Sequence, residues 1–410
     1  MTDLLPGPDD PTVAAPRGPD RLLGPDHAAP IPQLDTTSLL ALVEEAGLTG
    51  RGGAGFPTAR KLLSVSGRSS GLSSGRARVT RPVVVGNAME GEPLSHKDAV
   101  LLTQAPHLVV EGLVLLGTTL RARRMVLAVG PEIQTGPVTA AARGTRVEVR
   151  QLTGGFVAGQ ESALVNQLNG RAGVPTDPLV PVFRRGVDDR PTLVLNAETL
   201  AQLALVARYG PAWFRAQGTT ADPGTFLTTI SGSDRSLVRH PGVLEVSRGT
   251  TLRTALKAAG TDLPRVAAVL VGGYHGAWVP AAALDTPLSR DGLRPFGASP
   301  GAGVLHALAV EACPLQTAAA VTHYLAGQSA RQCGPCLNGL PRIAQTLRGL
   351  AVPGASAELV VEVERLRVLV TGRGACAHPD GTARFVASTM RIFSRHVEDH
   401  LKGYCHAATR

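Results

Sequence analysis

The sequence predicts an α/β protein built from three folded regions, and three observations support this. Between residues 82 and 195, short apolar segments alternate with helical stretches, which is typical of a largely parallel sheet flanked by helices. From about residue 225, short strand-like segments surround one helix. From Leu305 to Leu401, helical periodicity dominates. We therefore expect a flexible tail at 1–34, a Rossmann-like α/β domain at 35–222, a small β-grasp domain at 223–303 and a helical domain at 304–410.

The α/β domain begins with two expected helices around a glycine-rich segment. Thr37–Ala46 carries an apolar face and ends near Gly47, and Pro57 suits the first turn of a second helix that runs through Lys61. Buried strands are expected after these helices, at Pro82–Val85, Arg124–Val129, Arg146–Arg150 and Thr192–Leu195. Such strands, separated by helices, favour parallel pairing.

The β-grasp interpretation depends on the order of elements after residue 225. The expected elements are strands at Phe226–Ile230, Gly242–Val246 and Val266–Leu270 and a helix at Thr250–Ala259. Strand, turn, strand, helix, strand is the pattern of a small β-grasp domain. The residues from 1 to 34 are rich in proline, aspartate and glycine without periodicity, so they predict a tail.

Composition narrows the class of protein. The net charge is +9, but the 41 basic residues are scattered and only four are lysine, so nucleic-acid binding is disfavoured and an acidic electron-transfer partner is favoured. There is no run of about 18 apolar residues, and the acidic, proline-rich N-terminus is unlike a signal peptide. We expect a soluble cytoplasmic protein, with a peripheral place on a membrane complex as a further option.

A glycine-dense loop at Gly50–Thr58 is the first candidate site. Its centre leaves room for a planar ligand or a phosphate against bare backbone, through Gly52, Gly53, Ala54 and Gly55. Arg51 and Lys61 can supply positive charge, and the following helix would present free N–H groups. Taken alone, the loop could equally be structural.

The wider sequence resembles a known family. The string GLTGRGGAGFPTARK (47–61) resembles the flavin-mononucleotide loop of the NADH-binding flavoprotein subunit of respiratory complex I, and of its diaphorase relatives in hydrogenases and formate dehydrogenases. Further segments resemble that family in the same order, at Asn87–Pro93 with Lys97-Asp98, Gly154–Leu164, Asn196–Leu200 and His240–Leu244. The similarity covers about residues 36–405.

The resemblance implies a set of FMN-binding residues. It assigns Gly52, Gly53, Ala54 and Lys61 to the phosphate side, and Asn87 and Glu90 to the ribityl chain and ring edge. It assigns the rest of the pocket to Phe156, Gly159, Glu161, Asn196 and Thr199. Glu161 would be the most influential charge beside the ring. Without the resemblance, Asn87 and Asn196 would be interpreted as turn or capping residues.

The dinucleotide site departs from the family pattern. Phe56 stands where the family stacks an aromatic ring on NADH or NADPH, and Glu92 stands where the family places a carboxylate. Glu92 and Glu161 are the expected catalytic residues. A second family phenylalanine is Ser64 here, and the run near Pro178–Val182 has no ring until Phe183. Gln160 replaces a family glutamate, and Met89 an aspartate. We expect nicotinamide oxidation to be weaker or more selective than is usual in the family, and the flavin site to be better kept than the NADH site.

Three of the five cysteines form a candidate iron–sulfur site. Cys333 and Cys336 have C-x-x-C spacing and resemble the end of the family's S-C-G-x-C-x-P-C cluster loop. Cys376 fits the fourth cysteine of the family, which comes well after that loop. Ala330 occupies the first ligand position. Three thiolates can hold a 3Fe–4S cluster, or a 4Fe–4S cluster with a non-thiolate ligand at its last iron.

Other interpretations of the cysteines remain open. A three-ligand zinc site or a thiol switch would use the same C-x-x-C. The candidates for a fourth cluster ligand are Cys313, Cys405, His378 and His406. For Cys313 a buried structural thiol is the simpler role, and for Cys405 a free thiol.

Together these observations predict an oxidoreductase subunit that passes electrons from NADH or NADPH through FMN to an iron–sulfur cluster. The onward acceptor would be another electron-transfer subunit, a ferredoxin-like protein or a quinone-linked acceptor. One alternative is a non-catalytic electron-transfer or scaffold subunit that has lost dinucleotide oxidation. Another is a ligand-binding protein that works through the β-grasp domain. Loss of oxidised-flavin absorbance on adding NADH would separate the first two.

Overall fold

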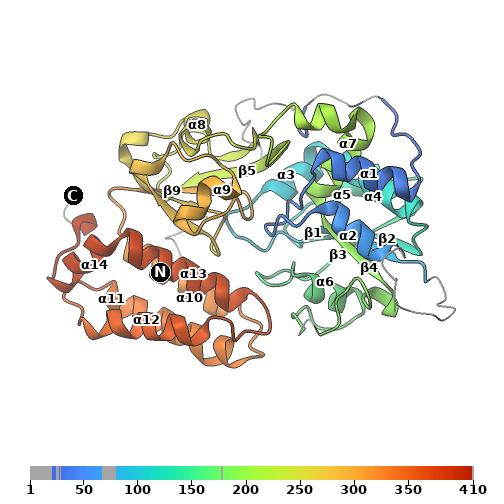
Figure 1. Ribbon diagram of the computed structural model, residues 1–410. Coiled ribbons are helices and arrows are strands. Elements are labelled where there is room, and N and C mark those ends of the chain that lie inside the picture. Colours follow the sequence, from blue (N-terminus) through green and yellow to red (C-terminus); the bar gives the residue numbers. More distant parts are fainter. Residues whose placement is uncertain (1–20, 25–26, 28, 67–79, 177–178, 409–410) are drawn as a thin grey trace.

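The computed structural model describes residues 21–24, 27, 29–66, 80–176 and 179–408, and these form two sheet domains and a helical bundle (Figure 1). The first sheet domain runs from α1 to α7, the second from β5 to β9, and the bundle from α10 to α14. In Figure 1 the helical bundle lies below the second sheet domain and extends away from the first sheet domain.

The first sheet has four parallel strands in the order β3-β2-β1-β4. Its strands are β1 Val83–Ala88, β2 Arg124–Val129, β3 Val147–Gln151 and β4 Thr192–Asn196. Its helices are α1 Thr36–Ala46, α2 Thr58–Val65, α3 Lys97–Gln104, α4 Pro106–Thr119, α5 Gly136–Ala141, α6 Glu161–Leu168 and α7 Ala197–Arg215. The predicted parallel α/β domain is confirmed.

Both faces of this sheet are buried, which explains why its strands are apolar throughout. Successive side chains of a strand point to opposite faces. Val84 packs in the larger core with α1, α4 and α7, whereas Val83 and Val85 pack in a smaller core with Leu164 of α6. The result is a three-layer, Rossmann-like arrangement.

The strand order contains a reversal that matters for the site. The chain adds β2 and β3 on one side of β1 and then returns to place β4 on the other side. In open parallel sheets, ligands bind in the crevice beyond the carboxyl ends of the two strands at such a switch point. Here those strands are β1 and β4.

The second sheet has five strands in the order β6-β5-β9-β7-β8, with β5 and β9 parallel and the other pairs antiparallel. Its elements are β5 Thr225–Gly232, β6 Gly242–Ser247, α8 Leu252–Ala258, β7 Val266–Val271, β8 Ala277–Pro280, α9 Arg290–Leu293 and β9 Val304–Ala309. The predicted boundary at 303 falls one strand too early, because β9 pairs with both β5 and β7. The prediction missed β9 because an apolar run as short as this strand cannot be distinguished from a segment of a buried helix.

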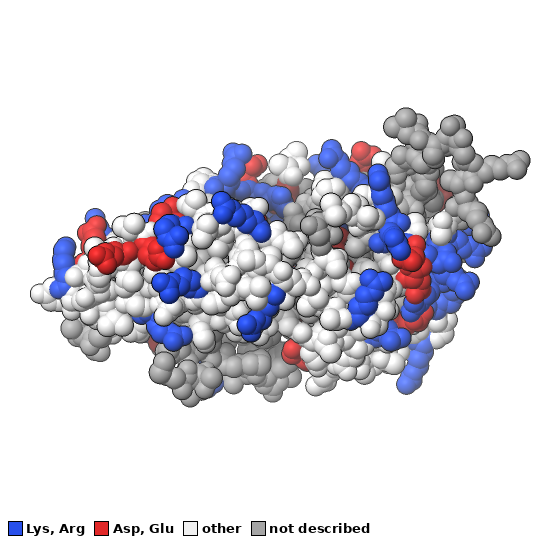
Figure 2. Space-filling model, turned by 90° about the horizontal axis from the view of Figure 1, so that it is seen from below, with Lys and Arg blue, Asp and Glu red and all other residues white. Residues whose placement is uncertain are grey.

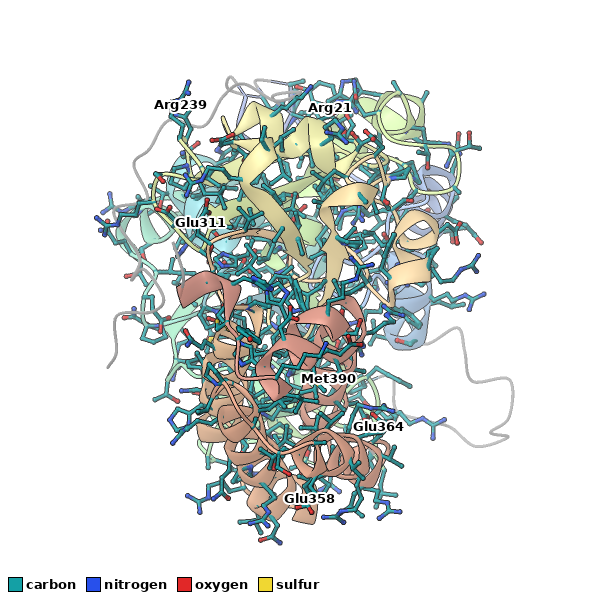
Figure 3. The ribbon with its side chains drawn as sticks, turned by 90° about the vertical axis from the view of Figure 1, so that its left-hand side faces the viewer. Arg21, Arg239, Glu311, Glu358, Glu364 and Met390 are labelled. Carbon is teal, nitrogen blue, oxygen red and sulfur yellow. The ribbon has the colours of Figure 1, made fainter. Side chains whose placement is uncertain are left out.

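The helical domain begins at Pro314. Its helices are α10 Pro314–Gly327, α11 Leu340–Leu350, α12 Glu358–Val370, α13 His378–Ile392 and α14 Ser394–Leu401. The indole of Trp278 on β8 donates to Thr389 on α13 at 3.1 Å, which ties the bundle to the second sheet. Figure 3 shows the consequence: Met390 on α13 lies nearer that sheet than Glu364 and Glu358 on α12.

The predicted tail is partly ordered. The carboxylate of Glu245 on β6 accepts hydrogen bonds from the backbone N–H groups of Arg21 and Leu22, at 2.8 and 2.7 Å, and Leu22 is fully buried. Residues 1–20 lie outside the described part of the chain. Proline and glycine content therefore misled the prediction for residues 21–24, where one buried carboxylate fixes the backbone.

Within the described residues, no single helix has the length and apolar character needed to cross a bilayer. Only α3 and α4 taken together reach that length, and they meet at an angle of 91°. Much of α4 packs in the core of the first domain.

Candidate functional site

The switch point of the first sheet brings two predicted site residues together. Asn87 and Asn196 are register partners near the ends of β1 and β4, and the Asn196 amide donates to the Asn87 carbonyl at 3.3 Å. Each also has a local structural role. Asn196 caps α7 by accepting from the Glu198 N–H at 3.0 Å, and Asn87 accepts from the Met89 N–H at 3.0 Å. Capping is therefore present, and contact with a flavin stays a prediction.

An ion pair lies at the same edge of the sheet. Lys61 on α2 pairs with Glu161, the first residue of α6, and also donates to the Val194 carbonyl at 3.3 Å. The two charged side chains keep 31% and 40% of their surface exposed. A phosphate arriving at this edge could therefore compete with Glu161 for the ammonium group of Lys61.

The glycine loop closes the crevice from one side. Gly53 and Gly55 have φ of 102° and 55°, so side chains there would be strained. A Cβ atom at Gly52 would lie 3.3 Å from the Cβ of Asn196, which places this backbone against the switch point. Arg290 of the second domain donates to the Ala54 carbonyl, so the loop is held between the two domains.

Arg51 differs from the prediction that it supplies charge to a phosphate. Its side chain is buried and donates to Thr49 and to the carbonyl of Pro223, at 3.1 and 3.3 Å. Burial, with the nearby charge of Arg248, lowers the pKa of Arg51 to about 9. Its backbone N–H donates to Thr199 at 2.9 Å, so the buried Thr199 holds the loop rather than lining an open pocket.

The segment Gly154–Glu161 forms the opposite wall. The amide of Asn87 donates to the Gly159 carbonyl at 2.9 Å, and a Cβ at Gly159 would come within 2.8 Å of the Met89 carbonyl. Gln160 caps α6, because its side chain accepts from the N–H groups of Ser162 and Ala163. An amide serves this cap as well as the family's glutamate, which gives the substitution a structural reason.

Glu90 is committed to a helix terminus. Its carboxylate accepts from the N–H groups of Asp98 and Ala99 at the start of α3, each at 3.1 Å, and from the Ser95 hydroxyl at 2.6 Å. Negative charge at a helix N-terminus is stabilising. Its predicted contact with a ribityl chain would have to be made in addition to these bonds.

Glu92 connects the first domain to the second. Its carboxylate accepts from the N–H of Tyr274, in the turn after β7, at 2.8 Å, and from that of Leu94 at 3.3 Å. Burial, which outweighs these hydrogen bonds, raises the pKa of Glu92 to about 7, and the charge of Glu90 adds to the effect. The carboxyl group can therefore hold a proton near neutral pH.

A buried charge network lies beneath the switch point. The sequence motifs contained its residues, but the sequence did not show that they form a network. Lys97 donates to Glu198 at 2.8 Å, to Asp98 at 3.2 Å and to the Asn196 side chain at 3.2 Å. Burial alone would lower the pKa of Lys97, but the two carboxylates together raise it. Because Asn196 also donates to Asp98 at 2.9 Å, the network fixes the orientation of the Asn196 amide.

Phe156 faces the helical domain. Its ring meets those of His275 and His378 with centroids 4.6 and 5.5 Å apart, and its N–H donates to Gln328 at 3.2 Å. Gln328 caps the end of α10, immediately before the cysteine loop. The segment that walls the crevice at Gly159 therefore contacts the approach to the cysteines at Phe156. The sequence singled out His378 as a candidate cluster ligand, but it carried no signal for the contact of His378 with His275.

The three predicted cluster cysteines converge. Cys333 and Cys336 share a side-chain hydrogen bond, and Cys376 lies near enough to interact electrostatically with both. Burial raises the pKa of Cys336 to about 12. Burial would also raise that of Cys333, but hydrogen bonds from the Ala375 N–H and from Cys336 outweigh it and lower that pKa.

Three of the four proposed fourth-ligand candidates, His378, Cys313 and Cys405, separate into two groups. His378 follows Cys376 closely, and its Nε2–H donates to the Leu325 carbonyl at 2.9 Å, near the end of α10. Cys313 and Cys405 instead group with His400, and the three ligand atoms lie within 4.8 Å of one another. Cys313 precedes α10 and the Cys333 loop follows it, so about 20 Å of helix separates the two groups. The suggestion that Cys313 or Cys405 completes the cluster is therefore wrong.

A cavity of about 430 Å³ opens beside the crevice, and Gln160, Glu161 and Phe183 contribute to its lining. Arg171 and Arg185 lie in the same wall. Phe183 is 37% exposed, and Phe56 in the glycine loop is 45% exposed. Large exposed rings of this kind are available to stack on a planar ligand.

Two family models match the chain. The Nuo51 FMN-binding domain matches residues 43–205, and the NADH-ubiquinone oxidoreductase-F iron-sulfur binding region matches residues 316–400. These ranges contain the crevice at the switch point and the converging cysteines.

Whole-chain comparisons agree. The NADH-quinone oxidoreductase F subunit of Streptomyces coelicolor is 29% identical over 388 residues, which cover 89% of this chain and 83% of that protein. The protein of the same name in Escherichia coli is 29% identical over 393 residues, covering 90% and 85%.

A solved NAD+-reducing [NiFe]-hydrogenase chain in the air-oxidized state has a TM-score of 0.77 and 29% identity. The match covers 91% of this chain but only 63% of the hydrogenase chain.

Proposed function

Because the chain belongs to the family of NADH-binding flavoprotein subunits of NADH-quinone oxidoreductases, we propose that it passes electrons from NADH or NADPH to an iron–sulfur cluster through FMN. The observation that carries this proposal is the segment Gly154–Glu161. One end of it walls the crevice beside Asn87, and the other end contacts Gln328 beside the cysteine loop. A donor site and an acceptor site thus share one short segment.

The residues at the switch point fit a flavin. Gly52 keeps open the space beside Asn196, and Lys61 offers an exposed ammonium group for the phosphate. Asn87, Asn196 and Glu161 offer polar groups for the ribityl chain and the ring edge. FMN, when bound, accepts an electron pair and releases electrons singly, which a nicotinamide cannot do. The protein's part is to orient the ring and to keep water away.

The cysteine loop fits an iron–sulfur cluster with incomplete thiolate ligation. Cys333, Cys336 and Cys376 supply three thiolates, and Ala330 has no ligand atom. His378 lies next in the chain after Ala377, but its ring hydrogen-bonds to His275 at 3.1 Å and to Leu325. We infer a 4Fe–4S cluster with one labile iron, or a 3Fe–4S cluster.

We assign the dinucleotide to the cavity beside Glu161. Phe183 supports this assignment because it lines that cavity and also lies in one pocket with Ser64, where the family has a ring. Phe183 can therefore replace the missing stacking partner from a different segment. Arg171 and Arg185 can pair with the pyrophosphate.

We assign the second domain to the β-grasp class. Its first strand, β5, lies beside its last strand, β9, in parallel, and one helix, α8, follows the first hairpin. This arrangement supports the assignment. Its role here is to support the glycine loop through Arg290 and the Glu92 carboxylate through Tyr274.

The electron acceptor is, in our proposal, another protein of an electron-transfer assembly. Basic side chains are spread along the face shown in Figure 2, with acidic ones between them, and this face carries no single basic stripe. The net charge of +9 favours an acidic partner. We place the protein in the cytoplasm, alone or peripheral to a membrane complex.

Anaerobic addition of NADH to the purified protein tests the function. We expect loss of the oxidised-flavin absorbance, followed by an electron paramagnetic resonance signal from the reduced cluster. Phe183→Ala should raise the apparent KM for NADH by roughly tenfold, the scale of a lost aromatic pair of about 1.5 kcal/mol, and should retain FMN. A protein with FMN and cluster but no absorbance change would be the non-catalytic electron-transfer subunit instead.

Gly52→Val tests the flavin site itself. Gly52 is not among the glycines with positive φ, so the substitution leaves the backbone unstrained while filling the space beside Asn196. We expect folded protein without FMN, measured by the flavin-to-protein ratio. Gly136→Val is the matched control, because a Cβ there meets no atom within 4 Å. Full FMN content in Gly52→Val would refute the site. Gly53→Val is less informative, since its φ of 102° strains any side chain.

A further inference from the structure

The helical domain has a second group of metal-binding side chains, at the end remote from the crevice. Cys313 precedes α10, His400 lies near the end of α14, and Cys405 follows α14. All three are buried, with His400 at 0% exposure. In Figure 1, α14 lies at the end of the bundle away from the first domain. Figure 3 labels Glu311, two residues before Cys313, where the chain enters the bundle.

The geometry of the group fits a metal site. The Nε2 atom of His400 lies 3.5 Å from the Sγ atom of Cys313, and all three ligand atoms lie within 4.8 Å. In tetrahedral zinc sites, Zn–S of about 2.3 Å and Zn–N of about 2.0–2.1 Å place the sulfur and nitrogen about 3.5 Å apart. The Cys313–His400 pair already has this separation.

The surroundings orient the ligands. The Nδ1 atom of His400 lies 3.3 Å from the carbonyl of Leu350, so Nδ1 carries the proton and Nε2 presents its lone pair to Cys313. A backbone carbonyl on the second ring nitrogen is the usual support of a metal-bound histidine. Cys313 lies at the N-terminus of the 14-residue α10. The backbone N–H groups of Leu315 and Gln316 donate hydrogen bonds to its sulfur. These bonds offset part of the free-energy cost of burying a thiolate.

We propose that Cys313, His400 and Cys405 bind one Zn²⁺ ion, with water in the fourth position. The ion would join the start of α10 to α14 and to the segment after it, and would hold the chain end against the bundle. The ligands are two thiolates and an imidazole, a set that selects zinc over magnesium or calcium. The site is independent of the flavin and of the cluster.

Elemental analysis with zinc-edge X-ray absorption on the full-length, anaerobically purified protein tests the proposal. We expect one zinc per chain in addition to iron, with two sulfur neighbours at about 2.3 Å and one nitrogen at about 2.0–2.1 Å. Cys405→Ser and His400→Ala should lose the zinc and keep iron and FMN. His323→Ala, an exposed histidine on α10, is the matched control and should keep zinc.

A second cysteine variant separates the two ends. Cys336→Ala should lose iron and keep zinc, because Cys336 lies in the other group. Zinc that disappears in Cys336→Ala but stays in Cys405→Ser would be adventitious metal in the cluster loop and would overturn the proposal. A wild-type protein with iron but no zinc, or with a Cys313–Cys405 disulfide by mass spectrometry, would overturn it as well. The wild-type measurement needs no variant to fold.

Discussion

The two ends of the helical bundle use cysteine in different ways. At the end near the crevice, Cys333 and Cys376 are partly exposed and lie in loops, and a ring contact from Phe156 reaches the neighbouring His378. At the far end, Cys313, His400 and Cys405 are all buried, and contacts from α10, α11 and α14 surround them. An electron-transfer centre needs access to a donor and an acceptor, whereas a structural metal needs enclosure. Cys336 is the exception, because it is buried although it belongs to the near end. The exposure of Cys333 and Cys376 thus distinguishes the near end, where we propose the cluster, from the enclosed far end, where we propose the zinc ion.

The largest expected effect concerns the missing ligand at the near end. Ala330→Cys restores a thiol at the first family position, so the cluster should survive air as 4Fe–4S. In the wild type, air should convert it to a 3Fe–4S species within the same exposure, because the iron without a thiolate is lost first. Electron paramagnetic resonance before and after air exposure measures both. Zinc at the far end should not change in either protein.

If wild type and Ala330→Cys lose iron equally in air, a non-thiolate residue already completes the cluster. Cys336→Ala supplies the lower limit for iron content in the same experiment.

A smaller effect is expected at the contact between crevice and cysteine loop. Gln328→Ala removes the acceptor for the Phe156 N–H, and Gln328→Glu keeps an acceptor oxygen. We expect Gln328→Ala to slow cluster reduction by roughly fivefold, the factor equivalent to one hydrogen bond of about 1 kcal/mol, while flavin reduction by NADH is unchanged. Stopped-flow absorbance at the two chromophores separates the steps. Equal cluster rates in all three proteins would show that this contact does not support electron transfer.

A further expected effect is a pH dependence of stability that arises from Glu92, where the first domain meets the second. The pKa of Glu92 is about 7 in the folded protein, against an ordinary value of 4.5. The folded state therefore holds a proton that the unfolded chain has lost, and stability falls as the pH rises from about 4.5 to 7. Glu92→Gln keeps an acceptor for the Tyr274 N–H without this titration. The stability of the variant relative to wild type should rise between pH 5 and 8, by up to about 3 kcal/mol.

Urea unfolding at both pH values checks this expectation. Parallel pH dependence in wild type and Glu92→Gln would mean that the Glu92 carboxyl group titrates normally. If the far end of the bundle is independent of the titration of Glu92, the protection of backbone amides around His400 against hydrogen exchange should be the same at the two pH values.

Much of this organisation could be predicted from the sequence. Apolar runs predicted all four strands of the first sheet, because burial on both faces makes such strands continuous in hydrophobicity. β8 and β9 were missed, since the first is only four residues long and the second contains His306 within an apolar run next to helices. Local patterns cannot distinguish such a strand from a helix end.

The site was predictable as a set of residues but not as a set of contacts. The motifs located Asn87, Asn196, Lys61 and Glu161, which the fold brings to one edge. They did not show that Arg51 turns inward, because burial of an arginine depends on distant groups such as the Pro223 carbonyl. The group around His400 was also missed, since Cys313 lies 87 residues before His400 and the three residues follow no familiar metal-binding spacing.

The late return of β4 to the side of β1 has a consequence for how the protein becomes active. The hydrogen bond between Asn196 and Asn87 spans 109 residues of sequence, so the crevice forms only when the chain has closed the long loop that contains β2 and β3. Contacts of such long sequence separation form slowly, because loop closure must precede them. A chain in which β4 has not yet returned to the side of β1 therefore lacks the crevice at which we propose that FMN binds.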